Sequence, residues 1–262
     1  MRADRQPARF LPGLGGLLRG EFTRWSGWRI LLHTAVWTLL VSGTLWYVTT
    51  NVRDASWRGF DLLIHIWWMV LPLGSIAIAQ NALIEERQAG TLSWIVSKPV
   101  SRPAFILSKI VSDSVGIILP AVVLQAAIAW WMLPALDPKA GLPIREPELT
   151  RYLVVVGIEM CIVVLFVTLT VCLGTIFRSR GPVAGIALAV WVLLWTSPSE
   201  TLERTSISGL VGGELSGASF KPLTEYLVFE QPLDPASGVF WTIVAAAVLT
   251  LGAVGFFSRE QF

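Results

Sequence analysis

Six apolar segments divide the chain, and their lengths constrain the fold more than any other feature. A helix needs about 20 apolar residues to cross the hydrocarbon core of a bilayer. Segments that reach or approach this length lie at approximately 30–49, 62–83, 104–133, 153–176, 182–195 and 239–257. The fifth segment is short, and the third is long enough to tilt or to project from the membrane. The sequence therefore predicts an all-α polytopic membrane protein with six transmembrane helices.

The composition of the chain supports a membrane-embedded fold. Hydrophobic residues make up 54% of the sequence and charged residues only 15%, which is far more apolar than an average soluble domain. No polar stretch is large enough to bury a core of its own. We therefore expect residues 1–262 to form a single membrane domain, with an interfacial segment at 1–29, a polar loop at 84–103 and a longer one at 197–238.

The positions of lysine and arginine predict the orientation of the chain, because loops that stay in the cytoplasm carry the excess of positive charge. Thirteen of the 20 basic residues lie before the first apolar segment, around the second loop, around the fourth loop, or after the last segment. The other side holds seven basic residues against eleven acidic ones. We expect a multi-pass protein of the cell (inner or plasma) membrane with both termini in the cytoplasm.

Catalytic and cofactor-binding signatures are missing from the sequence. A phosphate-binding loop of the type G-x-x-x-x-G-K-[ST] requires a Gly-Lys pair, and none occurs. His33 and His65 stand on different apolar segments, and no Cys/His cluster has the spacing of a metal site. The basic residues are spread along the chain, which argues against nucleic-acid binding. We therefore expect no catalytic residue, metal or cofactor on this chain.

Besides the two histidines, three ionisable residues fall within the apolar segments, where a charge costs about 3 kcal/mol unless it is paired or faces water. Glu159 lies roughly 12 Å inside the fourth segment. It either faces a substrate path or proton relay, or is a protonated carboxyl bonded to a neighbouring helix. Asp113 follows Lys109 by four residues, so we expect these two side chains to pair on one helix face.

The loop at 84–103 interrupts the apolar pattern with charges, a glycine and two prolines. Residues 85–96 favour a helix, and Pro99 then forces Lys98 out of the helical conformation. Ser101 or Arg102 can cap a new helix that accepts Pro103 in its first turn. The expected product is helix, break, helix at the cytoplasmic surface. From these residues alone, an interfacial amphipathic helix is an alternative interpretation.

The same loop carries a family resemblance. The sequence E-R-Q-A-G-T-L at 86–92, then K-P-V-S-R at 98–102 and Ser108-Lys109, resembles the coupling segment of type-two ABC exporter permeases. The family pattern is roughly E-R-x-x-G-T-L, a short apolar stretch, P-[VL]-[ST]-R and finally G-K. Here Ser108 stands where glycine is usual. Weaker likenesses are L-R-G-E-F at 18–22, G-T-I-F-R-S-R at 174–180 and F-S-R-E at 257–260.

The resemblance implies the permease subunit of an exporter, which forms a homodimer or related heterodimer. The dimer would dock on two copies of a cytoplasmic ABC ATP-binding subunit, which would hold ATP and Mg. It implies an amphipathic helix before the first span, at 11–28, and a coupling helix in the 84–103 loop. The residues expected at the interface with the ATPase are Glu86, Arg87, Gly90, Thr91, Leu92, Trp94, Pro99 and Arg102.

Two other functions are compatible with the residues. An ion-coupled secondary carrier without an ATPase would use Glu159 within the membrane. A complex that keeps the ATPase but transmits force, rather than pumping a substrate, would share the same loop. The sequence predicts the ATP-driven permease, because the 84–103 loop carries the most specific pattern.

Overall fold

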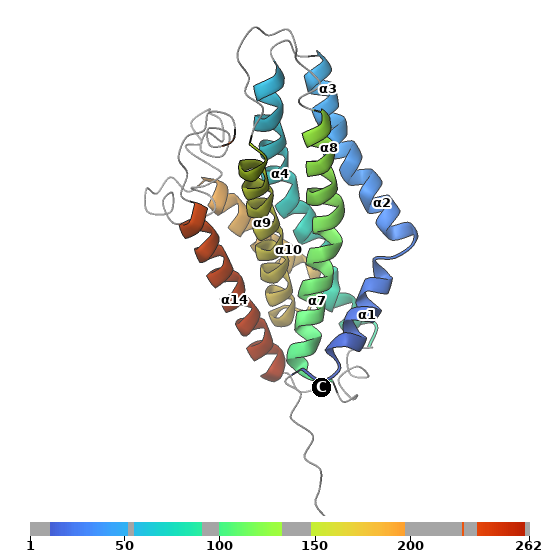
Figure 1. Cartoon of the computed structure of the whole chain (residues 1–262). Coiled ribbons are helices and arrows are strands. Elements are labelled where there is room, and N and C mark those ends of the chain that lie inside the picture. Colours follow the sequence, from blue (N-terminus) through green and yellow to red (C-terminus); the bar gives the residue numbers. More distant parts are fainter. Residues whose placement is uncertain are drawn as a thin grey trace, which may run out of the picture.

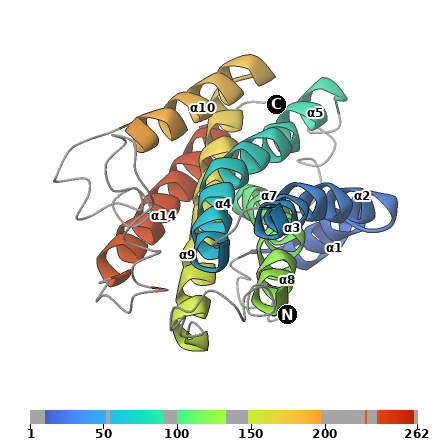
Figure 2. The same cartoon turned by 90° about the horizontal axis from the view of Figure 1, so that it is seen from above.

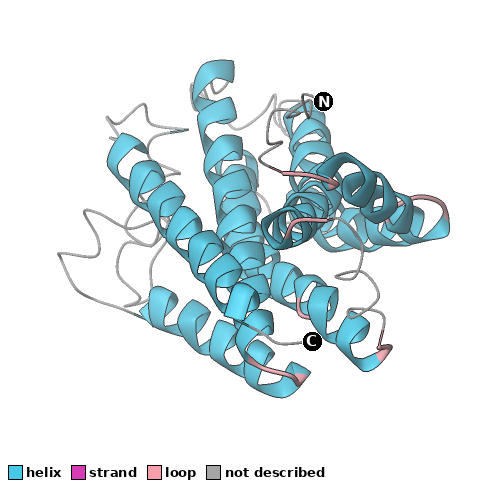
Figure 3. Ribbon diagram, turned by 90° about the horizontal axis from the view of Figure 1, so that it is seen from below, coloured by secondary structure: helices cyan, strands magenta, loops and turns pink. Residues whose placement is uncertain are grey.

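The computed structural model describes residues 11–51, 55–90, 100–132, 148–196, 227 and 235–259. Within these residues every regular element is a helix (Figure 3). The all-α class predicted from the sequence is therefore confirmed for this part of the chain.

The helices follow the apolar segments in order. In chain order they are α1 (Leu14–Arg24), α2 (Trp28–Trp37), η1 (Thr38–Gly43), α3 (Thr44–Asn51), α4 (Ala55–Ala79), α5 (Asn81–Gln88), α7 (Arg102–Ile117), η2 (Ile118–Val123), α8 (Leu124–Met132), α9 (Leu149–Ile176), α10 (Arg180–Thr196) and α14 (Pro235–Arg259). The elements η1 and η2 are turns of π-helix inside otherwise α-helical stretches. Consecutive long stretches run in alternate directions between two ends of the bundle (Figure 1).

One end of the bundle gathers four elements, and we call it the α1 end. It contains α1, α5, the beginning of α7 and the end of α14, and it is drawn at the bottom of Figure 1. The ends of α3 and α8 and the beginnings of α4 and α9 lie at the opposite end. The first and last described residues, 11 and 259, are therefore at the same end.

Helix α9 occupies the centre of the bundle and packs against α4, α7, α10 and α14 (Figure 2). Its buried side chains include Ile162 and Phe166, which lie in one core with Trp67 and Leu71 of α4. Polar groups of large buried side chains bond backbone carbonyls: Trp67 Nε1 donates to Ala121 at 3.1 Å. Such bonds satisfy polar atoms that have no access to water.

The two π-helical turns are joined by Gln125. Its Nε2 donates to Thr38 Oγ1 of η1 at 3.1 Å and to the Pro120 carbonyl of η2 at 2.9 Å, while its Oε1 accepts from Ser42 Oγ at 2.5 Å. Pro120 lacks an N–H and therefore cannot donate the hydrogen bond of a regular α-helical turn. The helix is wider at this point, where η2 forms a turn of π-helix. Gln125 is fully buried, and its side chain bonds a backbone carbonyl of η2 and two side-chain hydroxyls of η1.

Five helical stretches are long and apolar enough to cross a membrane, and they are Trp28–Val48, Leu62–Gln88, Arg102–Met132, Leu149–Ile176 and Val239–Arg259. They match five of the six predicted spans. Helix α10 covers the other predicted span but has only 17 residues, or roughly 25 Å against a hydrocarbon core of about 30 Å. The chain is therefore a multi-pass membrane protein, and the sixth crossing stays a prediction, as does the single-domain division.

Gly74 of α4 provides a test of the packing between α4 and the first apolar stretch. A Cβ atom at Gly74 would lie 2.6 and 2.7 Å from ring atoms of the buried Trp37. We expect Gly74→Ala to lower the thermal unfolding temperature in detergent, because overpacking costs about 1–3 kcal/mol. Gly157→Ala in α9 is the matched control, since nothing lies within 4 Å of that Cβ. Equal unfolding temperatures for the two variants would contradict the packing.

Candidate functional site

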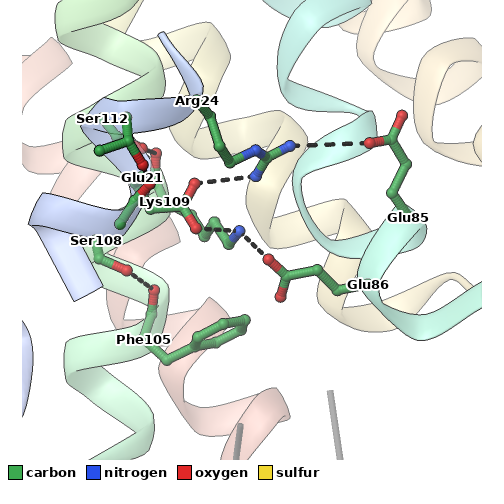
Figure 4. A network of polar contacts seen from close by, with 10 residues as sticks. Glu21, Arg24, Glu85, Glu86, Phe105, Ser108, Lys109 and Ser112 are labelled. Atoms are coloured by element: carbon green, nitrogen blue, oxygen red, sulfur yellow. Dashed lines mark hydrogen bonds and ion pairs between the residues drawn. The ribbon is translucent and has the colours of Figure 1, made fainter. Parts of the chain in front are cut away.

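Lys109 of α7 is fully buried, and its ammonium group lies between two carboxylates at the α1 end (Figure 4). Its Nζ is 2.6 Å from Oε1 of Glu21 in α1 and also contacts Oε1 of Glu86 in α5. Three helices that are distant in sequence therefore meet on one cation. A buried ammonium is tolerated only when such partners compensate for the lost hydration.

Arg24 extends this cluster of charges from α1 toward α5 and α10. Its guanidinium lies 3.0 Å from Glu21 Oε2 and 3.8 Å from Glu85 Oε2, and Glu85 Oε1 lies 3.4 Å from Arg180 at the start of α10. Burial is the largest single effect and opposes the charge of Arg24, but the surrounding carboxylates, with Glu21 first among them, together raise the pKa of the guanidinium. The contacts of the half-exposed Glu85 are screened by water and add less than those of Lys109.

Arg87 caps the end of the central helix α9. Its Nη1 donates to the carbonyl oxygens of Gly174 at 2.7 Å and Phe177 at 3.0 Å, and its Nη2 donates to Thr175 at 3.1 Å. The last carbonyls of a helix have no partner within the helix and carry partial negative charge. One guanidinium therefore connects the end of α5 to the end of α9.

The beginning of α7 is fixed by two neighbouring residues. Ser101 caps the helix, since its Oγ accepts a hydrogen bond from the Ala104 N–H at 3.3 Å. Arg102 donates to the carbonyl oxygen of Ser258 near the end of α14, and the rings of Phe105 and Phe257 stack beside it with centroids 5.3 Å apart. The sequence left Ser101 and Arg102 open as the cap; the structure has Ser101 in this position, and Pro103 lies in the first turn as predicted.

The start of α1 contacts the same point. The Ser101 N–H donates to the Pro12 carbonyl at 3.2 Å. Gly13 adopts a positive φ of 85°, and a Cβ there would lie 2.9 Å from the Val100 side chain. The backbone thus passes so close to residue 100 that only glycine fits without a shift. Helix α5 thus precedes segment 91–99 in the chain. Residues 100–102 follow the segment and contact the start of α1, the start of α7 and the end of α14.

Several predicted residues come together at this end of the bundle. Glu86, Arg87, Arg102 and Lys109 all hold helices to one another there. Thr91, Leu92, Trp94 and Pro99 lie outside the described residues. The assignment of these residues to an ATPase interface stays a prediction.

Two expectations about this region were wrong. The helix predicted over 85–96 is interrupted, because α5 ends at Gln88 and Gly90 adopts a φ of 67°. Lys109 does not form its ion pairs with Asp113, one turn along the same helix, but with Glu21 and Glu86 from other helices. Two partners that approach from outside the helix can surround the ammonium, whereas a neighbour on its own helix reaches it from one side.

The sequence did not single out Glu85 and Arg180 of this site as functional, and it did not single out Glu21 and Arg24. Both fall in α1, where only the L-R-G-E-F likeness drew attention to Glu21. The available signal was the lysine itself: a cation inside an apolar segment requires a carboxylate from another segment.

Glu159 is also fully buried in α9, and neither of its oxygens has a hydrogen-bond partner among the described residues. Its role in a pathway or in packing stays a prediction.

Comparison with protein families gives a match to one membrane-transport family. The family model described as ABC-2 family transporter protein matches residues 28–206, which is more than half of the chain. The chain belongs to this family. The resemblance seen in the 84–103 loop is thereby confirmed, and the matched region includes every candidate residue except those of α1. No curated protein matches the chain.

Replacing Lys109 tests the role of the buried cation. Lys109→Met keeps the side-chain volume but removes the buried ammonium that compensates both the Glu21 and the Glu86 carboxylates. We expect the free energy of unfolding, measured by denaturant titration in mixed micelles, to fall by about 3–5 kcal/mol. The exposed Arg19 of α1 gives the matched control, Arg19→Met. Equal unfolding free energies for the two variants would contradict the central role of Lys109.

Proposed function

We propose that this ABC-2 family permease exports its substrate with energy from ATP, which a separate cytoplasmic subunit binds with Mg and hydrolyses. Family membership supports a membrane component of an ABC transporter that associates with an ATP-binding subunit. Two permease chains, identical or related, would form the membrane part, and two ATP-binding subunits would dock beneath them. The α1 end of each permease would face the cytoplasm.

The main support for this proposal is the way segment 91–99 is connected at both flanks. On one side Glu86 bonds Lys109 of α7, and Arg87 holds the end of α9. On the other side Arg102 bonds the end of α14, and Ser101 contacts the start of α1. A displacement of the segment would therefore act on four helices at once.

This arrangement gives the motif residues two separate tasks. Leu92 and Trp94 would enter a cleft of the ATP-binding subunit as apolar anchors, as expected from the family pattern. Glu86, Arg87 and Arg102 would transmit the movement, since their side chains bond other helices of the permease. Docking and transmission are then separable by mutation.

Reporter fusions test the orientation and the sixth crossing together. The excess of basic residues at the α1 end predicts a cytoplasmic location for this end. A reporter fused after Arg180 should be found inside, and one fused after Glu214 should be found outside, because α10 lies between the two positions. Both reporters in the same compartment would contradict a crossing by α10.

Trp94→Ala tests docking. A buried aromatic anchor contributes about 2 kcal/mol or more at an interface, so binding of the ATP-binding subunit should weaken by roughly 30-fold. Affinity is measured with the purified permease in nanodiscs and the ATP-binding subunit that copurifies with it. Trp131→Ala is the control, because that exposed side chain lies at the opposite end of the bundle. Unchanged affinity for Trp94→Ala would contradict the docking assignment.

Arg87→Gln tests transmission in the same assay. We expect the variant to bind the ATP-binding subunit with normal affinity, while the stimulation of ATP hydrolysis by the permease falls at least several-fold. The reason is that the variant loses the charge-assisted bonds to the end of α9. An equal loss of affinity would instead place Arg87 in the docking surface.

A further inference from the structure

A groove of about 380 Å³ opens beside the charge cluster, between the α1–α2 corner and the junction of α4 with α5. Its lining includes Trp25, Arg29 and His33 from the α1–α2 corner, Asn81 from α5 and Asp113 from α7. The volume corresponds to about a dozen water molecules, which is enough for the polar headgroup of a lipid. The groove includes Arg24 and Glu85 of the charge cluster, but Arg29 lacks a carboxylate partner and one side-chain oxygen each of Asn81 and Asp113 lacks a hydrogen-bond donor among the described residues.

The cationic wall of the groove is Arg29. This residue is exposed, and within the described part of the chain it has no carboxylate partner, whereas Arg24 is held by Glu21 and Glu85. Gly27 adopts a φ of 70° at the corner between α1 and α2, which turns the chain so that Arg29 stands over the groove. A guanidinium in this position suits a phosphate, because two phosphate oxygens can accept hydrogen bonds from two of its N–H groups.

Two residues from α5 and α7 offer hydrogen-bond acceptors to the groove. Oδ1 of Asn81 and Oδ2 of Asp113 are buried, and neither has a hydrogen-bond partner among the described residues. A buried acceptor without a donor is unfavourable, so both atoms favour a ligand that brings N–H groups. The indole of Trp25 lies against the same space, packed over Gly116 of α7, and an aromatic ring also favours a cation.

The surface next to the groove is apolar. On α2, Trp28 is 74% exposed and Leu31 is 61% exposed, and α2 begins one of the stretches that can cross the membrane. The polar groove therefore lies where a membrane-spanning helix begins. A ligand with its head in the groove can place acyl chains along α2.

We propose that this groove binds the headgroup of an ethanolamine phospholipid. The phosphate is bound by Arg29, and the ammonium donates hydrogen bonds to Asn81 and Asp113 beside Trp25. A choline headgroup has no N–H to donate, and a glycerol headgroup has no positive charge, so both bind less well. The inference requires a membrane-spanning chain but not ATP coupling, and its test does not depend on a transport assay.

Native mass spectrometry of the detergent-purified full chain tests the proposal. The protein is titrated with phosphatidylethanolamine, phosphatidylcholine or phosphatidylglycerol of the same acyl chains, and bound lipid is counted. We expect phosphatidylethanolamine to bind tightest. Arg29→Ala and Asn81→Ala should each weaken its binding by about tenfold or more, as expected for bonds to charged groups. Asn81→Ala should weaken phosphatidylglycerol binding much less, because the glycerol hydroxyls can donate only uncharged hydrogen bonds to Asn81.

Two matched variants control for general effects. Arg19→Ala removes the same charge from the exposed surface of α1, and Gln80→Ala removes a neighbouring amide; neither residue lines the groove. Equal effects of Arg29→Ala and Arg19→Ala, or equal binding of the three lipids, would overturn the proposal. Soluble glycerophosphoethanolamine is added as a competitor. If it binds as tightly as the lipid, the occupant is a free phosphoethanolamine ester and the lipid assignment is wrong.

Discussion

The burial of Lys109 is the constraint on which the α1 end of the structure depends. An ammonium group without access to water requires carboxylates close by, and here they come from α1 and α5 rather than from its own helix. Satisfying one charge therefore fixes three helices relative to one another. The amphipathic helix predicted near the N-terminus corresponds in position to α1, and the Glu21–Lys109 contact shows why α1 is held against the bundle: its single buried residue is Glu21.

Polar contacts are distributed unevenly along the bundle. At the α1 end Arg87 and Arg102 bond backbone carbonyls near the ends of α9 and α14, while halfway along the bundle Gln125 bridges two π-helical turns. Contacts of this kind have preferred geometries, unlike apolar packing, which adapts by small shifts. Segment 91–99 thus lies between residues whose side chains make directional bonds to other helices.

The sequence predicted the helical class and five of the spans, because long apolar runs leave little choice of structure in a membrane. It predicted a cap at Ser101 or Arg102 for the same kind of local reason. It did not predict the partners of Lys109, since Glu21 is 88 residues away in the chain and spacing along one helix favoured Asp113. The contacts of Arg87 with α9 were equally inaccessible, because they depend on how α5 and α9 pack. Local rules identified which residues need partners, and only the tertiary structure identified the partners.

A buried ion cluster adds little stability compared with apolar packing of the same volume, so its presence at the base of segment 91–99 argues for a role in transmission. Charges that exchange partners give a small number of discrete arrangements, which is what a switching element requires. The proposed lipid groove shares Arg24 and Glu85 with this cluster. A headgroup in the groove and a displacement of segment 91–99 would therefore act on the same side chains. Thermodynamic linkage then requires that lipid binding and this displacement change each other's free energy by the same amount.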